Sequence, residues 1–180
     1  MLDYIPLTAT AGRRLATLEL RDLATERMRG LGYAYVGTEV APARAGLRFD
    51  VVGIARWSRQ VRIYEVKSSR GDFLGDAKWE RYLTYCTHFA FVAPAGAIHR
   101  WELAPGIGLV EYGAPAFERM RRARRYGVTI LREDCLRATR PSRRLRDAVE
   151  DPAWIALLET IVFAGRPESL GAEFVAGGGI

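Results

Sequence analysis

The sequence is poor in cysteine and lysine and contains no long apolar run. Its two cysteines, Cys86 and Cys135, stand in different surroundings and lack the spacing of metal ligands. We interpret them as free thiols in a reducing compartment, with a bridge between them as the alternative. No apolar run reaches the roughly 18 residues of a membrane-spanning helix, and the first residues lack the basic and apolar regions of a signal peptide. We therefore expect a cytoplasmic protein without a membrane partner.

The overall composition is that of a globular protein with a substantial core. Apolar residues make up 49% of the 180 residues and charged residues 27%, which excludes disorder throughout. This length fits one compact domain. We expect residues 1–113 to form its core. Residues 114–180, a basic Arg-rich segment and a C-terminal helix, are expected to pack on the same domain.

Positive charge is concentrated in one segment. The net charge is +6, and residues 114–150 account for all of it, with eleven arginines against five acids. Such a local excess indicates a polyanionic partner, most commonly nucleic acid. The alternative is a solvated, Arg-rich helical face. The arginines that we assign to nucleic-acid binding are Arg119, Arg121, Arg122, Arg124, Arg125, Arg143 and Arg144.

Only two of the 27 basic side chains are lysines, and the others are arginines. These two lysines, Lys67 and Lys78, lie within twelve residues of each other. A lysine retained in so arginine-rich a chain marks a place where the compact ammonium is needed and the planar guanidinium does not fit. Both positions therefore become candidates for a chemical role.

Hydrophobic patterning predicts an α/β fold. Helix-forming residues over 13–29 end at glycines, and aromatic and β-branched runs predict strands at 33–40, 49–54, 61–67, 88–93 and 107–112. Further helices are expected over 72–86 and 142–163, whereas residues 116–126 fit a helix or a polar strand. The order helix, three strands, helix, strand (α-β-β-β-α-β) predicts a three-layer core with a mixed sheet flanked by helices.

A candidate site lies where the second and third predicted strands meet. Because side chains alternate along a strand, Glu65 and Lys67 share a face. If a tight connection pairs the two strands, Asp50 lies beside them, and Glu39 can join from the first strand. Carboxylate oxygens suit Mg²⁺ or Mn²⁺, and a neighbouring lysine can orient or deprotonate a water. The alternative is an ion pair on an exposed sheet face, worth ~0.2–1 kcal/mol.

The predicted helix over 72–86 places Lys78 on an apolar, aromatic face with Trp79 and Tyr82. A lysine on a buried face is unfavourable unless an anion meets it. Its side chain either extends past the aromatic rings to water or points into the acidic cluster, which is the interpretation that we adopt. We interpret Trp79 and Tyr82 as core residues rather than base-stacking platforms.

These residues resemble a known signature. Phe49-Asp50, followed after fourteen residues by Glu65-Val66-Lys67, resembles the PD-(D/E)XK nuclease motif, with Phe49 in place of the proline. The run EVKSSRGDFLGDAKWERYLTYC is similar to the MmcB-like DNA repair family, whose members carry an Asp, an E-x-K followed by Ser-Ser, an Asp-Phe, a Lys-Trp and two tyrosines in this order. The similarity extends over residues 30–113.

The resemblance implies a restriction-endonuclease-like fold and a metal-dependent DNA phosphodiesterase. It makes Asp50 and Glu65 ligands of Mg²⁺ or Mn²⁺, with the Val66 carbonyl as a third ligand and Lys67 as the residue that positions the water. The other family positions matched are Glu39, which looks like an auxiliary acid, and Ser69, Asp72 and Lys78.

We therefore predict a Mg²⁺- or Mn²⁺-dependent deoxyribonuclease of DNA repair, recombination or genome defence, located in the cytoplasm at the nucleoid. The alternative is a catalytically inactive, nucleic-acid-binding scaffold that joins other proteins in a repair complex, since the superfamily includes inactive relatives. The retained Asp, Glu and Lys favour the enzyme. A homodimer would suit cleavage of both strands, but nothing in the sequence supports one.

Overall fold

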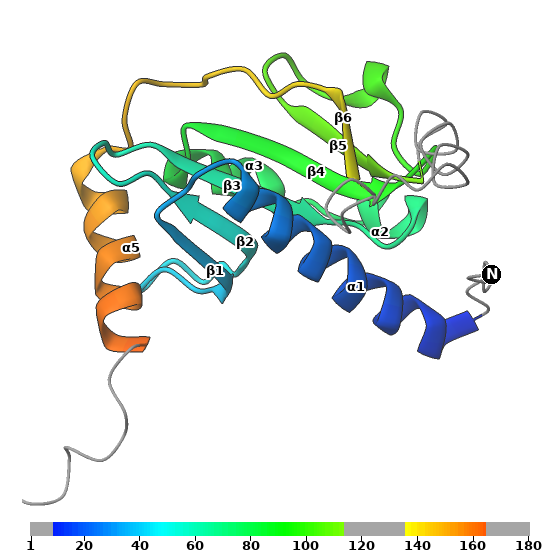
Figure 1. Ribbon diagram of the computed structural model, residues 1–180, viewed down its shortest axis with the longest axis horizontal. Coiled ribbons are helices and arrows are strands. Elements are labelled where there is room, and N and C mark those ends of the chain that lie inside the picture. The colour runs from blue at the N-terminus through cyan, green and yellow to red at the C-terminus, as the bar shows by residue number, and fades with distance from the viewer. Residues whose placement is uncertain (1–8, 114–135, 165–180) are drawn as a thin grey trace, which may run out of the picture.

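The computed structural model describes residues 9–113 and 136–164, which form one mixed sheet with helices on both faces (Figure 1). The strands are β1 (Tyr35–Val40), β2 (Phe49–Ile54), β3 (Val61–Val66), β4 (His88–Pro94), β5 (Gly108–Tyr112) and β6 (Leu136–Arg140). The helices are α1 (Ala9–Gly30), α2 (Arg70–Leu74), α3 (Trp79–Tyr82) and α5 (Asp151–Ala164), with 3₁₀ turns η1 (Leu83–Tyr85) and η2 (Arg100–Glu102). None of the helices in these ranges is long and apolar enough to cross a membrane.

The six strands lie in sequence order across the sheet. β1, β2 and β3 are antiparallel, β3, β4 and β5 are parallel, and β6 is antiparallel to β5. A parallel pair needs a long crossover, and the segment that contains α2 and α3 supplies it between β3 and β4. The prediction of an α/β protein with a mixed, helix-flanked sheet is confirmed.

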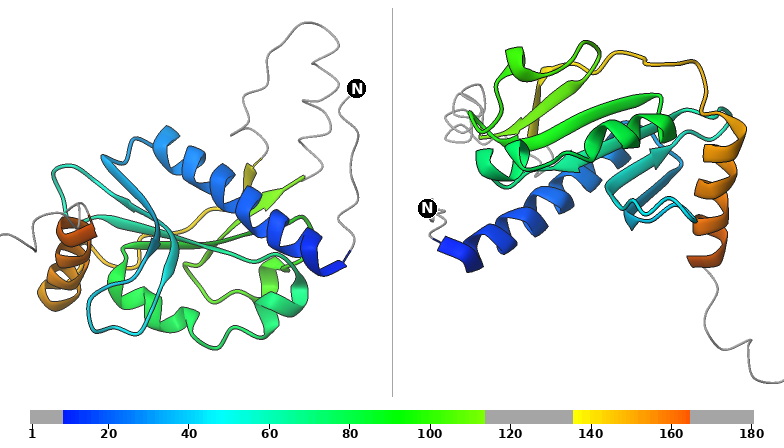
Figure 2. Two further views of the ribbon diagram at one scale, coloured as in Figure 1. Left: turned by 90° about the horizontal axis from the view of Figure 1, so that it is seen from below. Right: turned by 180° about the vertical axis from the view of Figure 1, so that it is seen from behind.

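Helices lie on both faces of the sheet (Figure 2), and an apolar layer holds them on each face. On one face α1 packs Leu23 and Met28 against Tyr64 and Val66 of β3, among others. The opposite layer joins α3, η1 and α5 to the sheet and includes Phe89 of β4. β4 is buried on both faces, as expected of a strand with parallel neighbours in the middle of a sheet. The helices on the two faces of the sheet therefore pack from both sides against the end of β3, where the charged residues of the candidate site lie.

Trp79 and Tyr82 belong to the second layer, so their interpretation as core residues is confirmed. The Trp79 ring packs edge-on against Phe91, with centroids 5.6 Å apart, and Tyr82 packs edge-on against Phe49 at 5.1 Å. Such edge-to-face pairs are favoured by the quadrupoles of the rings.

The prediction of one helix over 72–86 is wrong, because the helix is broken at its centre. α2 ends at Leu74, Gly75 caps it, and α3 begins only at Trp79. Glycine and aspartate disfavour helix interiors, and the Asp76 carboxylate accepts the backbone N–H of Lys78 at 2.8 Å instead of leaving it to a helical partner. Both short helices pack on the same face of the sheet. Apolar residues therefore recur at helical spacing on both sides of the break, and the sequence pattern does not reveal it.

The terminal helix is also shorter than predicted. It begins at Asp151 rather than within 142–150, because backbone N–H groups of the preceding segment bond to other parts of the chain. The Leu145 N–H donates to Thr87 at 2.9 Å and that of Val149 to Arg59 at 3.2 Å. The strand β6 was not expected, although its sequence LRATR alternates apolar and polar residues.

Several predictions fall on residues 114–135, outside the described ranges. They concern the alternatives for residues 116–126, the position of Cys135, and five of the arginines assigned to nucleic acid (Arg119, Arg121, Arg122, Arg124 and Arg125). The division of the chain at residue 113 stays a prediction for the same reason. Residues 136–164 do pack on the sheet, through β6 and α5.

Candidate active site

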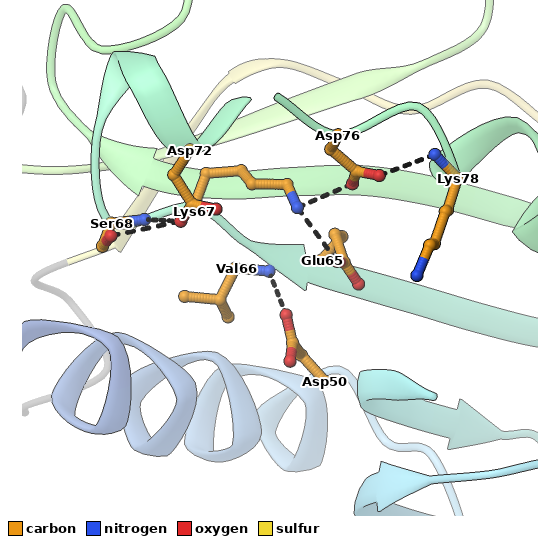
Figure 3. A network of polar contacts seen from close by, with 8 residues as sticks. All are labelled: Asp50, Glu65, Val66, Lys67, Ser68, Asp72, Asp76 and Lys78. Atoms are coloured by element: carbon orange, nitrogen blue, oxygen red, sulfur yellow. Dashed lines mark hydrogen bonds and ion pairs between the residues drawn. The ribbon is translucent and has the colours of Figure 1, made fainter. Parts of the chain in front are cut away.

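The candidate site begins where β2 and β3 separate. The last paired residues are Val51 and Tyr64; beyond them the Asp50 carboxylate, instead of a backbone carbonyl, accepts the Val66 N–H at 2.7 Å (Figure 3). The N–H and C=O of one strand residue point to the same side. The Val66 carbonyl therefore faces the same gap as Asp50, and this gap is lined with oxygen atoms.

On the other side of Asp50, the β1 ladder is interrupted at Glu39. Continuing the register of the neighbouring pairs places Glu39 toward Asp50 and Asp50 toward Glu65, although neither pair belongs to the ladders. Besides burial, the charge of Glu39 raises the pKa of Asp50, and the charge of Asp50 raises that of Glu65. Glu39 has a φ of 54°, in the left-handed region that non-glycine residues seldom adopt. Its carboxylate is paired with Arg21 of α1 and, at 2.7 Å, with Arg48. Glu39 is thus a neighbour of Asp50 whose carboxylate is already engaged by two guanidinium groups.

Lys67 is buried between two carboxylates. Its ammonium lies 3.0 Å from Glu65 Oε1 and 2.6 Å from Asp76 Oδ2, and the three side chains are only 6%, 9% and 10% exposed, respectively (Figure 3). The second carboxylate oxygen of Glu65 is buried and has no hydrogen-bond partner among the described residues. A buried carboxylate oxygen without a partner is unfavourable, so this atom would gain stability from a hydrogen-bond donor or a cation.

The pKa values follow from this burial. Burial, and then the charge of Asp50, raises the pKa of Glu65 to about 8, against the opposing effect of Lys67. Burial also raises the pKa of Asp50, although the Val66 N–H and Lys67 oppose it. For Lys67, burial lowers the pKa, but Glu65 and Asp76 outweigh this effect and leave it raised. The ammonium therefore stays charged, and perturbed groups of this kind concentrate at functional sites.

A pocket of about 400 Å³ opens onto Glu65 and Lys67, whereas Asp50 and Val66 do not line it. Its walls come from the end of β3, from α2 and from the link to α3, and are formed by Glu65, Lys67, Gly71, Asp72, Gly75, Asp76, Ala77 and Lys78. The expectation that Lys78 is buried on an apolar face is wrong, because the break in the helix leaves it exposed. It lines the pocket nonetheless, so both lysines of the chain border one cavity.

Asp76 is the site residue that the sequence interpretation missed. It lies in the break between α2 and α3, and its carboxylate contacts the Lys67 ammonium and the Lys78 backbone. The one signal in the sequence is the pair Gly75-Asp76, two poor helix formers in the middle of a predicted helix.

Ser69 and Asp72 build the start of α2, directly after Lys67. Ser69 is the N-cap, whose hydroxyl accepts the Asp72 N–H at 3.3 Å. Asp72 in turn accepts the N–H of Ser68 at 2.9 Å and its hydroxyl at 3.1 Å. This reciprocal arrangement resembles a capping box. It fixes the direction in which the chain leaves Lys67, while Asp72 also lines the pocket.

The donor set fits a hard divalent cation coordinated mainly by water and substrate. The described ranges contain no group of three or more His, Cys, Asp or Glu side chains arranged to hold a metal ion. Mg²⁺, however, is commonly bound by one or two carboxylates together with waters and phosphates. Asp50, Glu65 and the Val66 carbonyl supply oxygen atoms only, and the unpartnered Oε2 of Glu65 gains a partner if a cation binds.

The structure does not bring Arg143 and Arg144 to this pocket. The Arg143 N–H donates to the Gly106 carbonyl, just before β5, and Arg144 forms an ion pair with Asp147 at 3.3 Å. β3, β4 and β5 are parallel, and the pocket is at the carboxyl end of β3. Both arginines are exposed and lie toward the opposite end of these strands.

Comparison with known proteins assigns the chain to a family. The model of the family described as "DNA repair protein MmcB-like" matches residues 7–148, and the chain therefore belongs to the MmcB-like DNA repair proteins. A similar solved structure is the SPO1766 protein of unknown function from Silicibacter pomeroyi. It is 23% identical with a TM-score of 0.58, and the alignment covers 83% of this chain and 85% of that one. At this identity the likeness shows the fold alone. No curated protein matches the chain.

Proposed function

We propose that this chain is a metal-dependent DNA nuclease with a restriction-endonuclease-like core of the PD-(D/E)XK superfamily. The observation that carries the proposal is the buried cluster of Asp50, Glu65 and Lys67 beside an open pocket. Membership of a DNA repair family supports DNA as the substrate. A functional conclusion has to rest on such a site, because the fold by itself does not define an activity.

Asp50, Glu65 and the Val66 carbonyl are the residues that would hold Mg²⁺ or Mn²⁺. When bound, such an ion supplies positive charge against the charge that develops on a scissile phosphate, and it acidifies a bound water. The buried, unpartnered oxygen of Glu65 supports this assignment.

Lys67 orients the attacking water rather than deprotonating it. Its pKa is raised by Glu65 and Asp76 against the effect of burial, so the ammonium keeps its proton at neutral pH. The ammonium donates a hydrogen bond to Glu65 and forms an ion pair with Asp76, and an ammonium has three N–H donors, so it can also donate to a water or a phosphate oxygen. We assign Asp76 the positioning of Lys67.

Lys78 contributes to substrate binding at the rim of the pocket. Its exposed side chain carries positive charge beside the acidic cluster. Contacts of this kind with phosphates fix the register of a nucleic acid without reading its sequence.

The alternative is an inactive scaffold that binds DNA in a repair complex. The observation that favours it is the pairing of Lys67 with Glu65 and Asp76, since buried ion pairs of this kind also occur as structural elements. In this case the cluster stabilises the end of β3, and DNA binding needs no cation.

The deciding experiment is cleavage of labelled single-stranded, duplex, nicked and branched DNA in Mg²⁺, Mn²⁺ or EDTA. Wild type is compared with Glu65→Ala, Lys67→Met and a control, Glu80→Ala, at an exposed position of α3. We expect metal-dependent products from wild type and the control. The two site variants should cut at least about 100-fold more slowly while folding and binding DNA.

The outcomes separate the two functions. If every protein binds DNA and none cuts it, the scaffold function is correct. If cleavage survives in both Glu65→Ala and Lys67→Met, the assignment of the site is wrong.

A further inference from the structure

The connection between β4 and β5 presents an exposed aromatic pair beside α2. Trp101 in η2 is 80% exposed. The His99 ring is stacked on it, with centroids 4.4 Å apart and the planes within 8°. Aromatic side chains ordinarily gain stability from burial, and an indole exposed to water does not. An exposed pair held in one arrangement is therefore a candidate for binding a ligand.

A salt bridge holds this pair in place. Glu102 accepts two hydrogen bonds from the Arg70 guanidinium, at 2.6 and 2.9 Å, and a third from the His99 N–H at 2.9 Å. The hydrogen bonds from Arg70, then that from His99, lower the pKa of Glu102 to about 2. The bidentate geometry fixes orientation as well as distance.

β6 holds the same connection from the other side. The Arg140 guanidinium donates to the carbonyls of Arg100 and Leu103, both at 2.8 Å, and to that of Ala104 at 3.1 Å. The Leu103 side chain is buried in the apolar layer. The aromatic pair is therefore preorganised, which lowers the entropy lost when a ligand binds.

α2 joins the aromatic pair to the pocket. Arg70, its first residue, forms the salt bridge to Glu102, whereas Gly71 and Asp72 line the pocket. Arg70 and Arg140 bind this connection and Arg100 belongs to it, whereas its acidic partners are Glu102 and Glu111, so these five charges leave a net positive charge that is complementary to phosphates. A nucleic-acid strand with one phosphate at the pocket can pass over α2 to the pair.

We propose that Trp101, backed by His99, stacks on an unpaired DNA base, and that the substrate therefore contains a single-stranded segment next to the reacting phosphate. This inference rests on the proposed function. Bases in a duplex already stack on one another, so an exposed ring finds a free base face only where pairing is open. Stacking platforms of this kind beside basic residues are typical of proteins that bind single strands.

The chain offers a matched control in Trp57, between β2 and β3. It is 88% exposed, and the Arg56 guanidinium lies over its ring at 5.0 Å. It precedes β3, whereas the pocket lies at the other end of that strand. Replacing Trp57 removes a comparable exposed area away from the pocket.

The test measures the affinity of the full chain for fluorescein-labelled oligo-dT and for a duplex of equal length, in EDTA to prevent cleavage. Trp101→Ala should weaken oligo-dT binding on the order of tenfold and leave duplex binding unchanged. Trp101→Phe should stay within about threefold of wild type because the ring still stacks, while losing the quenching of indole fluorescence by oligo-dT. Trp57→Ala should bind both DNAs as wild type does.

Other results overturn the stacking platform. The first is oligo-dT binding by Trp101→Ala that equals binding by wild type, as expected if this surface contacts a protein. The second is an equal loss of affinity for both DNAs in Trp101→Ala. The third is an equal loss of oligo-dT affinity in Trp57→Ala. If wild type cleaves DNA and Trp101→Ala is unaffected, the platform alone is wrong. If wild type binds neither DNA, the proposed function fails with it.

Discussion

Replacing Glu65 by glutamine should stabilise the folded protein at alkaline pH. The Glu65 carboxylate is buried, and one of its oxygens has no hydrogen-bond partner within residues 9–113 and 136–164. Burial and the charge of Asp50 raise the pKa of Glu65 to about 8. The folded state therefore holds this proton more tightly than the unfolded state, in which the pKa is ~4.3. The free energy of unfolding must then fall as the pH rises from ~4.3 through about 8, and level off above it.

The magnitude follows from the two pKa values. Linkage over this interval predicts that ionisation of Glu65 removes roughly 2–3 kcal/mol of stability between pH 6 and pH 9. Glu65→Gln has the shape of the protonated acid and cannot ionise. It should therefore match wild type only below pH ~4, where Glu65 is protonated in both the folded and the unfolded state, and its stability advantage over wild type should grow by this amount between pH 6 and pH 9.

The assay is urea denaturation at pH 6, 7, 8 and 9, in EDTA because a bound cation would favour the ionised form. Glu80→Gln, on the exposed side of α3, removes a charge of the same kind and should follow the wild-type curve. A stability difference between Glu65→Gln and wild type that does not change with pH would refute the reasoning. So would a variant less stable than wild type at pH 9.

Three further changes test other parts of the structure. Asp76→Asn weakens the buried ion pair and should lower the free energy of unfolding, measured by urea denaturation, by about 2–4 kcal/mol. Asp72→Asn, at an exposed position, should lower it less. Gly108→Ala should destabilise the protein by about 1–3 kcal/mol in the same assay, because its Cβ would lie 2.8 Å from a backbone nitrogen. In Gly71→Ala the Cβ meets no described atom within 4 Å, so this variant should not be destabilised. Burial raises the pKa of the Cys86 thiol to about 12, so it should react with a disulfide reagent only after unfolding, measured in a variant without the other cysteine. A thiol that reacts in the folded protein, or glycine variants of equal stability, would contradict these assignments.

Local patterns in the sequence were sufficient for most of the elements and for part of the site. The strand over 49–54 lies where its aromatic and β-branched residues predicted, and the helix over 13–29 lies within α1. Glu65 and Lys67 line one pocket because residues two apart share a face in any strand. The E-x-K run and the residues after it also identified the DNA repair family, which the comparison with known proteins confirms.

Only the tertiary structure decided how these groups meet. The break at Gly75 depends on a competition between helical hydrogen bonds and the Asp76 side chain for the Lys78 N–H. The hydrophobic periodicity of the sequence does not reveal this competition. The same break turns Asp76 toward Lys67 and leaves Lys78 exposed. The pKa of Glu65 depends on burial by atoms from separate segments of the chain and on the charge of Asp50 from a different strand. Local patterns express what a residue prefers along its own element, whereas burial and charge at a point are sums over neighbours that the fold alone assembles.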